Sequence, residues 1–161
     1  MARVGRIVRT GWPVVLEMAA TLPGPPDVVW GLITDWEHQD DWMLEASDFV
    51  VTSDIREGVG VEAEATITIG GIKTRDKVRV VGWEPEQRLA IEHLGWVSGR
   101  GEIFLTKLGG DRTHLYWREQ LVPPMGAAGA LGITAFKPLM HRIFQRDLKV
   151  LAALTRAASS R

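Results

Sequence analysis

Three ionisable residues alternate with apolar residues along predicted strands: Asp76, His93 and Glu119. Because successive side chains of a strand point to opposite faces, each would share the apolar face of its strand. A carboxylate or an imidazole in an apolar pocket has a shifted pKa and can transfer protons, as cyclisation and dehydration require. The alternative is structural: near the rim of a sheet, these groups would only satisfy one another's hydrogen bonds. The pattern leaves both interpretations open.

A wider set of residues is predicted to contact a hydrophobic ligand: Trp30, Ile67, Val78, Ile91, Ile103, Trp117, Glu119, Phe136, Met140 and Phe144. Tryptophan is unusually frequent, with seven residues against four phenylalanines and one tyrosine. Indole rings bury large areas and also line pockets for flat apolar ligands. Because pockets are few per protein, each tryptophan taken alone is more often a core residue.

Other clusters point away from cofactor or metal chemistry. Residues 58–63 read Gly-x-Gly-x-x-Ala, but an alternating strand pattern follows instead of the helix that dinucleotide binding needs. His38, Asp40 and Asp41 form a dense polar cluster, and a polar turn is favoured over a metal site because adjacent carboxylates diverge on a helix. The chain has no cysteine, which excludes disulfides and thiolate catalysis. We expect no cofactor and no metal.

The totals indicate one globular domain and give no reason to expect nucleic acid as a partner. The 161 residues suit a single domain over residues 1–161, with a core at about 14–157. A backbone-binding surface needs a marked excess of lysine and arginine, whereas the formal net charge is -1. Arg3, Arg6 and Arg9 cluster near the N-terminus and are interpreted as a solvated tail.

The apolar segments predict a soluble, cytoplasmic protein without a transmembrane segment. Pro13 and Glu17 interrupt the first apolar run, which therefore makes a poor signal peptide. The apolar stretch at residues 125–136 falls far short of the roughly 20 residues that cross a bilayer. The absence of cysteine fits a reducing compartment. We expect a monomer or a weak homodimer.

The spacing of apolar residues predicts a strand, two short helices, six further strands and one long helix. The strands are expected at residues 14–22, 49–53, 61–69, 73–83, 88–94, 102–108 and 113–122, and the helices at 25–33, 36–43 and 136–156. Short turns between strands predict an antiparallel meander. Two segments are expected to be irregular: a glycine-rich connection at residues 95–101, and a loop or loose first turn from Gly126 to Thr134, with Pro138 marking a kink or the true helix start.

The predicted order of elements implies an α+β fold with a cavity. A sheet with one apolar face must cover it, and the C-terminal helix is its one long amphipathic partner. If the sheet is strongly curved, this helix cannot fill the concave side completely. An enclosed cleft that suits an apolar ligand follows. The alternating strands give no sign of the exposed apolar patch that a regulator of other proteins would need.

Several short motifs in this order resemble the START / birch-pollen-allergen-like (SRPBCC) superfamily, and within it the polyketide cyclase/dehydrase-like group. They are Pro26-Asp27-Val28-Val29-Trp30, Trp83-Glu84-Pro85, Gly101-Glu102-Ile103, Trp117-Arg118-Glu119 and Phe144-Gln145-Arg146-Asp147-Leu148. The resemblance implies a helix-grip fold, a curved sheet around one long helix, that binds a lipid, isoprenoid, polyketide or similar molecule. The alternative that it implies is a polyketide aromatase/cyclase, with His93 or Asp76 transferring protons and Glu119 as its partner.

Overall fold

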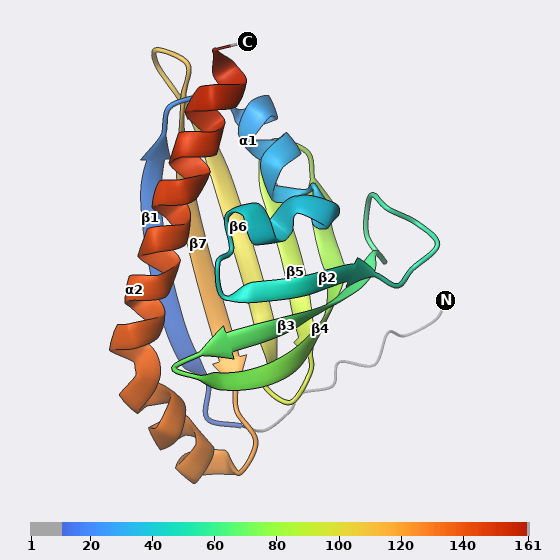
Figure 1. Cartoon of the computed structure of the whole chain (residues 1–161), viewed down its shortest axis with the longest axis vertical. Helices are drawn as coiled ribbons and strands as arrows, with labels where there is room; N and C mark the ends of the chain where they lie inside the picture. The colour runs from blue at the N-terminus through green and yellow to red at the C-terminus, as the bar shows by residue number, and fades with distance from the viewer. Residues whose placement is uncertain (1–10, 161) are drawn as a thin grey trace.

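A curved antiparallel sheet wraps around one long helix in the computed structural model, which describes residues 11–160 (Figure 1). The strands are β1 (Val14–Leu22), β2 (Ala46–Val51), β3 (Glu62–Ile69), β4 (Ile72–Glu84), β5 (Arg88–Leu94), β6 (Ser98–Leu108) and β7 (Arg112–Val122). The helices are α1 (Pro26–Ile33), the 3-10 helix η1 (Trp36–Asp41) and α2 (Gly126–Ser159). The predicted helix-grip fold is confirmed. Arg3, Arg6 and Arg9 lie outside the described residues.

The seven strands form one sheet in the order β1-β7-β6-β5-β4-β3-β2. Strands β2 to β7 make the predicted meander, and β1 adds to β7 at one edge. The register shifts between Val80 and Gly82 in β4 and between Ser47 and Val50 in β2. Such bulges bend a strand and increase its twist, which helps the β2–β4 part of the sheet to curl toward α2.

Helix α2 begins about ten residues earlier than predicted, because Gly126 to Thr134 are helical. Alanine is the strongest helix former, and three alanines in this segment favour a helix despite its glycines. Pro138 removes one backbone hydrogen bond and is accommodated inside the helix rather than ending it. No helix among residues 11–160 is long and apolar enough to cross a membrane.

The predicted glycine-rich connection is also wrong, because Gly99 and Gly101 lie inside β6. Hydrogen-bonded neighbours on both sides hold these glycines in the ladder, with Gly99 opposite His93 of β5 and Leu121 of β7. Glycine weakens an isolated strand, but pairing on both edges compensates for that weakness. The strand therefore continues through a segment whose composition predicts a loop.

The two halves of α2 have different surroundings. Met140, Phe144, Leu148 and Leu151 are buried against the sheet at helical spacing, and β1 contributes the facing residues Leu16, Met18 and Leu22. None of residues 126–139 is buried. The N-terminal end of the helix reaches beyond the strands (Figure 1). Packing therefore fixes the C-terminal half of α2, and the N-terminal half borders an opening.

Candidate functional site

A cavity with two chambers lies between the concave face of the sheet, the η1–β2 segment and α2. The outer chamber has a volume of about 380 Å³ and the inner one about 80 Å³. Six residues line both chambers, which are therefore contiguous: Met43, Ile67, Asp76, His93, Trp117 and Glu119. The three ionisable residues predicted from strand alternation thus lie where the chambers meet.

Asp76, His93 and Glu119 form one hydrogen-bonded group, which we call the charged triad. His93 Nδ1 lies 2.8 Å from Asp76 Oδ2, and His93 Nε2 lies 3.0 Å from Glu119 Oε2. Trp117 Nε1 donates a hydrogen bond of 2.7 Å to the other Glu119 oxygen, Oε1. The side chains of His93 and Glu119 are only 14% and 6% exposed. The triad is therefore a largely desolvated set of charges on the cavity wall.

A glycine in β6 allows the triad to form. His93 is on β5 and Glu119 on β7, so their side chains must meet across the strand between them. Gly101 pairs with Glu119, and a Cβ atom placed on Gly101 would lie 2.6 Å from the Glu119 carboxylate. Gly99 has a different role, because a Cβ atom there would clash with the Gln120 carbonyl oxygen of β7. Gly101 therefore leaves the space in which the triad forms, in a segment whose composition predicts a connection.

The two carboxylates keep His93 protonated. Burial by itself lowers the pKa of the imidazole, but the charge of Glu119, with hydrogen bonds from both sides, outweighs it and raises the pKa to about 10. Near pH 7 both ring nitrogens therefore donate, one to each carboxylate. Because these nitrogens point in opposite directions, the two carboxylates do not converge on a single metal position. The triad therefore combines one cation with two carboxyl side chains.

A second acidic pair, not predicted from the sequence, borders the outer chamber. Glu45 and Asp147 are both buried, and the Leu44 backbone N–H donates to Asp147 Oδ1 at 3.3 Å. Arg146 approaches Asp147 at 3.4 Å and Glu45 at 4.0 Å. Among residues 11–160, no donor bonds to Glu45 Oε2 or Asp147 Oδ2. Burial, with Asp147 adding to it, raises the pKa of Glu45 to about 8, so this pair holds a proton at neutral pH.

Aromatic rings form much of the apolar wall. Trp117 packs between Trp42 and Phe144, with ring centroids 6.0 and 5.0 Å away. Trp36 stacks on Phe49 at 6.4 Å beside the inner chamber. These rings surround the triad with surface that suits a flat apolar molecule.

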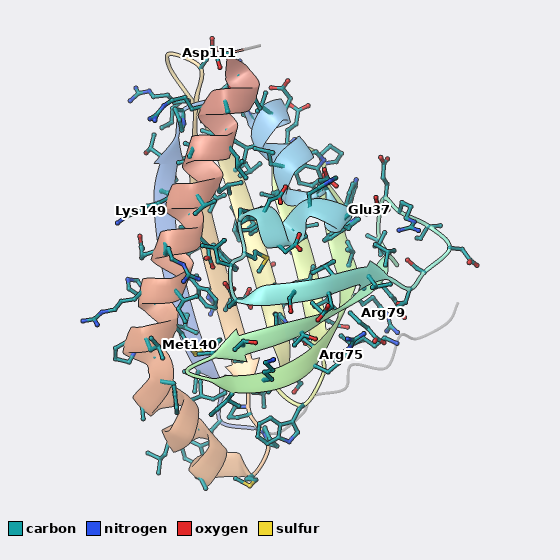
Figure 2. All side chains as sticks on the ribbon, viewed as in Figure 1. Glu37, Arg75, Arg79, Asp111, Met140 and Lys149 are labelled. Atoms are coloured by element: carbon teal, nitrogen blue, oxygen red, sulfur yellow. The ribbon has the colours of Figure 1, made fainter. Side chains whose placement is uncertain are left out.

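Nine of the ten residues predicted to contact a ligand line the cavity. Ile67, Val78, Ile91, Ile103, Trp117 and Glu119 line the inner chamber, and Phe136, Met140 and Phe144 line the outer one. Met140 lies on α2 close to the β3–β4 hairpin (Figure 2). Trp30 lines neither chamber, because its ring packs edge-on against Trp83 at 5.1 Å. The prediction for Trp30 is therefore wrong as to position.

The polar cluster in η1 is occupied with local contacts. His38 Nδ1 lies 2.9 Å from Asp35 Oδ2, and both side chains are exposed. Residues 58–60 form a turn, with Gly58 and Gly60 at positive φ, and residues 62–63 already belong to β3. Neither His38 nor these glycines line the cavity.

Comparisons with known proteins identify the fold and the family. No curated protein matches the sequence significantly. Among solved structures, TTHA0849 from Thermus thermophilus is 21% identical with a TM-score of 0.77, over 91% of this chain and 99% of that one. The Zhui aromatase/cyclase from Streptomyces sp. R1128 is 17% identical with a TM-score of 0.76, over 90% and 94%. A START superfamily protein from Mycobacterium smegmatis is 12% identical with a TM-score of 0.65, over 91% and 97%.

At these identities, likeness to solved structures establishes the fold alone. The family is shown by a separate match of the sequence to a family model, which covers residues 13–156. This match spans every strand, both short helices and nearly all of α2. The chain therefore belongs to the family described as polyketide cyclase / dehydrase and lipid transport.

Proposed function

We propose that this protein binds a hydrophobic small molecule, with the apolar part of the ligand in the outer chamber and its polar end at the charged triad. The observation that carries the proposal is the cavity itself: about 380 Å³ of mostly apolar space that ends at one group of buried charges. Ligand sites typically exceed about 300 Å³ and combine apolar walls with few polar groups. The family description and the START superfamily neighbour support this class of function.

The triad favours a ligand that donates a hydrogen bond. Both N–H groups of His93 are used by the carboxylates, and both oxygens of Glu119 accept hydrogen bonds within the protein. Asp76 Oδ1 is the carboxylate oxygen of the triad that no side chain among the described residues engages. A hydroxyl, phenol or enol could donate to it, whereas a ligand carboxylate would meet its negative charge. We therefore expect neutral ligands rather than fatty acids.

A second candidate is cyclisation and dehydration of a polyketide. The Zhui protein, which shares the fold, is named an aromatase/cyclase, and the cavity wall here carries an imidazole and two carboxylates. However, a general base works best with a pKa near the operating pH, and His93 with a pKa of about 10 is protonated at neutral pH. Ligand binding therefore ranks first.

A matched ligand panel tests the proposal. Thermal unfolding is measured near pH 7 with pairs that differ in one group, such as 2-naphthol against 2-naphthoic acid and a long-chain alcohol against its acid. A ligand at 100 times its Kd stabilises a protein by about 2.7 kcal/mol, which is easily detected. We expect the alcohols and phenols to raise Tm and the acids to do so far less. Asp76→Asn should weaken binding roughly tenfold, because a hydrogen bond to a charged group is lost.

Two controls complete the test. Trp30→Phe changes a tryptophan outside both chambers and should leave the ligand affinity unchanged. Unchanged melting with every ligand, or stronger stabilisation by the acids, would contradict the proposal. Conversion of a poly-β-keto substrate by the wild type but not by His93→Phe would instead establish the cyclase candidate.

We also propose a cytoplasmic protein that is monomeric or weakly dimeric and binds no nucleic acid. The lack of cysteine and the formal net charge of -1 support this part of the proposal. Cell fractionation and size-exclusion chromatography measure the first two properties directly.

A further inference from the structure

Exposed apolar side chains gather at the mouth of the cavity. Four of them line the outer chamber and are 40–75% exposed: Ile72, Trp96, Met125 and Phe136. Leu131 lies on the same N-terminal part of α2, and Leu139 approaches the β3–β4 hairpin at Gly70. We call these six residues the mouth patch. Its residues lie in α2 and at the β3–β4, β5–β6 and β7–α2 connections. Alternation along the strands therefore could not predict it.

Exposed basic residues border the mouth patch. Residues 65–75, 94–101 and 120–139, which form this end of the molecule, contain no aspartate or glutamate. They contain Lys73, Arg75, Arg100 and Lys137, all of which are exposed. Arg75 and Arg100 form ion pairs with Glu64 and Glu102, with N–O distances of 3.1 and 3.3 Å, whereas Lys73 and Lys137 form no ion pair among residues 11–160. Apolar and basic side chains thus occur together here.

The opposite end of the sheet carries charges of both signs. Glu84, Glu86 and Arg88 lie at the β4–β5 turn, and Asp111 and Arg112 lie at the β6–β7 turn. Asp111 and Met140 lie far apart along the long axis of the molecule (Figure 2). The cavity thus opens at the end of the molecule that carries the mouth patch.

We propose that the mouth patch docks the protein onto a bilayer that contains anionic lipid, so that the cavity opens toward the membrane. Tryptophan and aliphatic side chains enter the interfacial region of a bilayer, and neighbouring lysines are attracted to anionic headgroups. This inference goes beyond ligand binding and does not depend on it.

A lipid surface fits the patch better than a protein partner does. Residues 123–133 offer prolines, glycines, alanines, Met125, Leu131 and Ile133, with no polar side chain among them. A protein interface carries about one hydrogen bond per 100–200 Å² and a polar rim, whereas acyl chains require neither. Separate side chains that protrude from turns and a helix also insert into lipid without a complementary shape on the other side.

Vesicle flotation with the full chain tests the proposal without any cavity ligand. Vesicles of phosphatidylcholine are compared with vesicles that also contain phosphatidylglycerol. We expect the protein to float with the anionic vesicles, and added salt to reduce the bound fraction because it screens exposed charges. The double variant with Lys73→Glu and Lys137→Glu should lose the preference for anionic vesicles.

A matched pair of variants separates docking from general surface effects. Leu131→Glu places a carboxylate on the patch at a side chain that is 73% exposed and lines neither chamber. Val59→Glu does the same at a 61% exposed side chain outside the mouth patch. We expect Leu131→Glu to weaken vesicle binding at least tenfold and Val59→Glu to leave it unchanged, with both variants melting like the wild type.

Three results would overturn the proposal: no flotation of the wild type with either vesicle, equal effects of the two glutamate variants, or no effect of Leu131→Glu. If the wild type floats with neither vesicle, the basic residues beside the mouth patch favour an acidic protein as the partner instead. Because flotation is measured without ligand, its failure leaves the proposed ligand binding standing, and a failed ligand panel leaves docking standing.

Discussion

Two buried acidic groups border the same cavity, and their negative charge is reduced in different ways. In the charged triad, Asp76 and Glu119 flank a protonated His93, and each carboxylate accepts a hydrogen bond from it. In the second pair, Glu45 and Asp147 face each other with Arg146 only at the margin, and the raised pKa of Glu45 means that a proton replaces a cation.

The difference follows from where each group lies. The triad spans three strands of one sheet, whose ladder fixes the distances between its members. The acidic pair joins α2 to the segment before β2, so it bridges two elements that no ladder holds. An ion pair needs fixed geometry to offset the cost of desolvation, and the acidic pair, with Arg146 only at its margin, holds a proton instead. The triad therefore keeps a protonated imidazole inside the cavity, whereas the acidic pair lowers its negative charge by holding a proton.

Replacement of the protonated His93 should have the largest effect on the free energy of unfolding. His93→Phe leaves two carboxylates buried without their donor, and breaking a buried ion pair typically costs about 3–5 kcal/mol. Urea denaturation near pH 7 measures the change in the free energy of unfolding. The matched control is His38→Phe, which removes an exposed histidine paired with Asp35 and should cost far less, because solvent screens an exposed pair. Equal losses in the two variants would show that burial adds nothing to the triad.

Adding a side chain at Gly101 in β6 should have the next largest effect on stability. Gly101→Ala places a methyl group against the Glu119 carboxylate and should displace it from His93. We expect a loss of about 1–3 kcal/mol in stability, typical of overpacking, together with weaker ligand binding. Gly109→Ala is the control, because a Cβ atom there meets nothing within 4 Å. If the two alanine variants have equal stability and affinity, the glycine does not position Glu119.

The smallest change in stability is expected at the acidic pair, where the substitution should stabilise the protein rather than destabilise it. The pKa of Glu45 is higher in the folded protein, so its contribution to stability is present below about pH 4.5 and is lost as pH rises to about 8. Glu45→Gln should abolish this loss and raise the stability at pH 8.5 by about 1–2 kcal/mol. Melting curves recorded between pH 4 and pH 9 measure this dependence of stability on pH.

His93 makes a separate contribution to the same profile. Its pKa is also raised on folding, so its stabilisation is complete below about pH 6.5 and is lost toward pH 10.

The control for Glu45→Gln is Glu57→Gln, at an exposed position, which should leave the dependence of stability on pH unchanged. If Glu45→Gln lowers the stability at pH 8.5, the buried pair is not held together by a proton.

Strand alternation was sufficient to place the triad on the concave face. Along β7, burial alternates as predicted, with Trp117 and Glu119 inside. Along β4 the bulge follows Val80, so it does not change the face on which Asp76 lies. Alternation reports only the face, however. That His93 reaches both carboxylates depends on the register of the strands and on the space at Gly101 in β6, which are properties of several strands together.

The acidic pair and the mouth patch were missed for different physical reasons. Asp147 lies three residues after Phe144 and four before Leu151, and this spacing could have placed it on the buried face of α2. Glu45 precedes β2 in a segment without periodicity, so nothing local marks it as buried. The residues of the mouth patch come from distant parts of the chain and share a surface only after the sheet has curved.

The position of β1 has a consequence for the order in which the chain can assemble. Each of β2 to β6 pairs with the strand that follows it, whereas β1 pairs only with β7, from Val14 opposite Leu121 to Leu22 opposite Thr113. During synthesis the first strand therefore leaves the ribosome about a hundred residues before its partner. The meander can form while the chain grows, but β1 remains an unpaired edge until β7 is complete. The interior of the protein is thus closed by its earliest strand and its last helix.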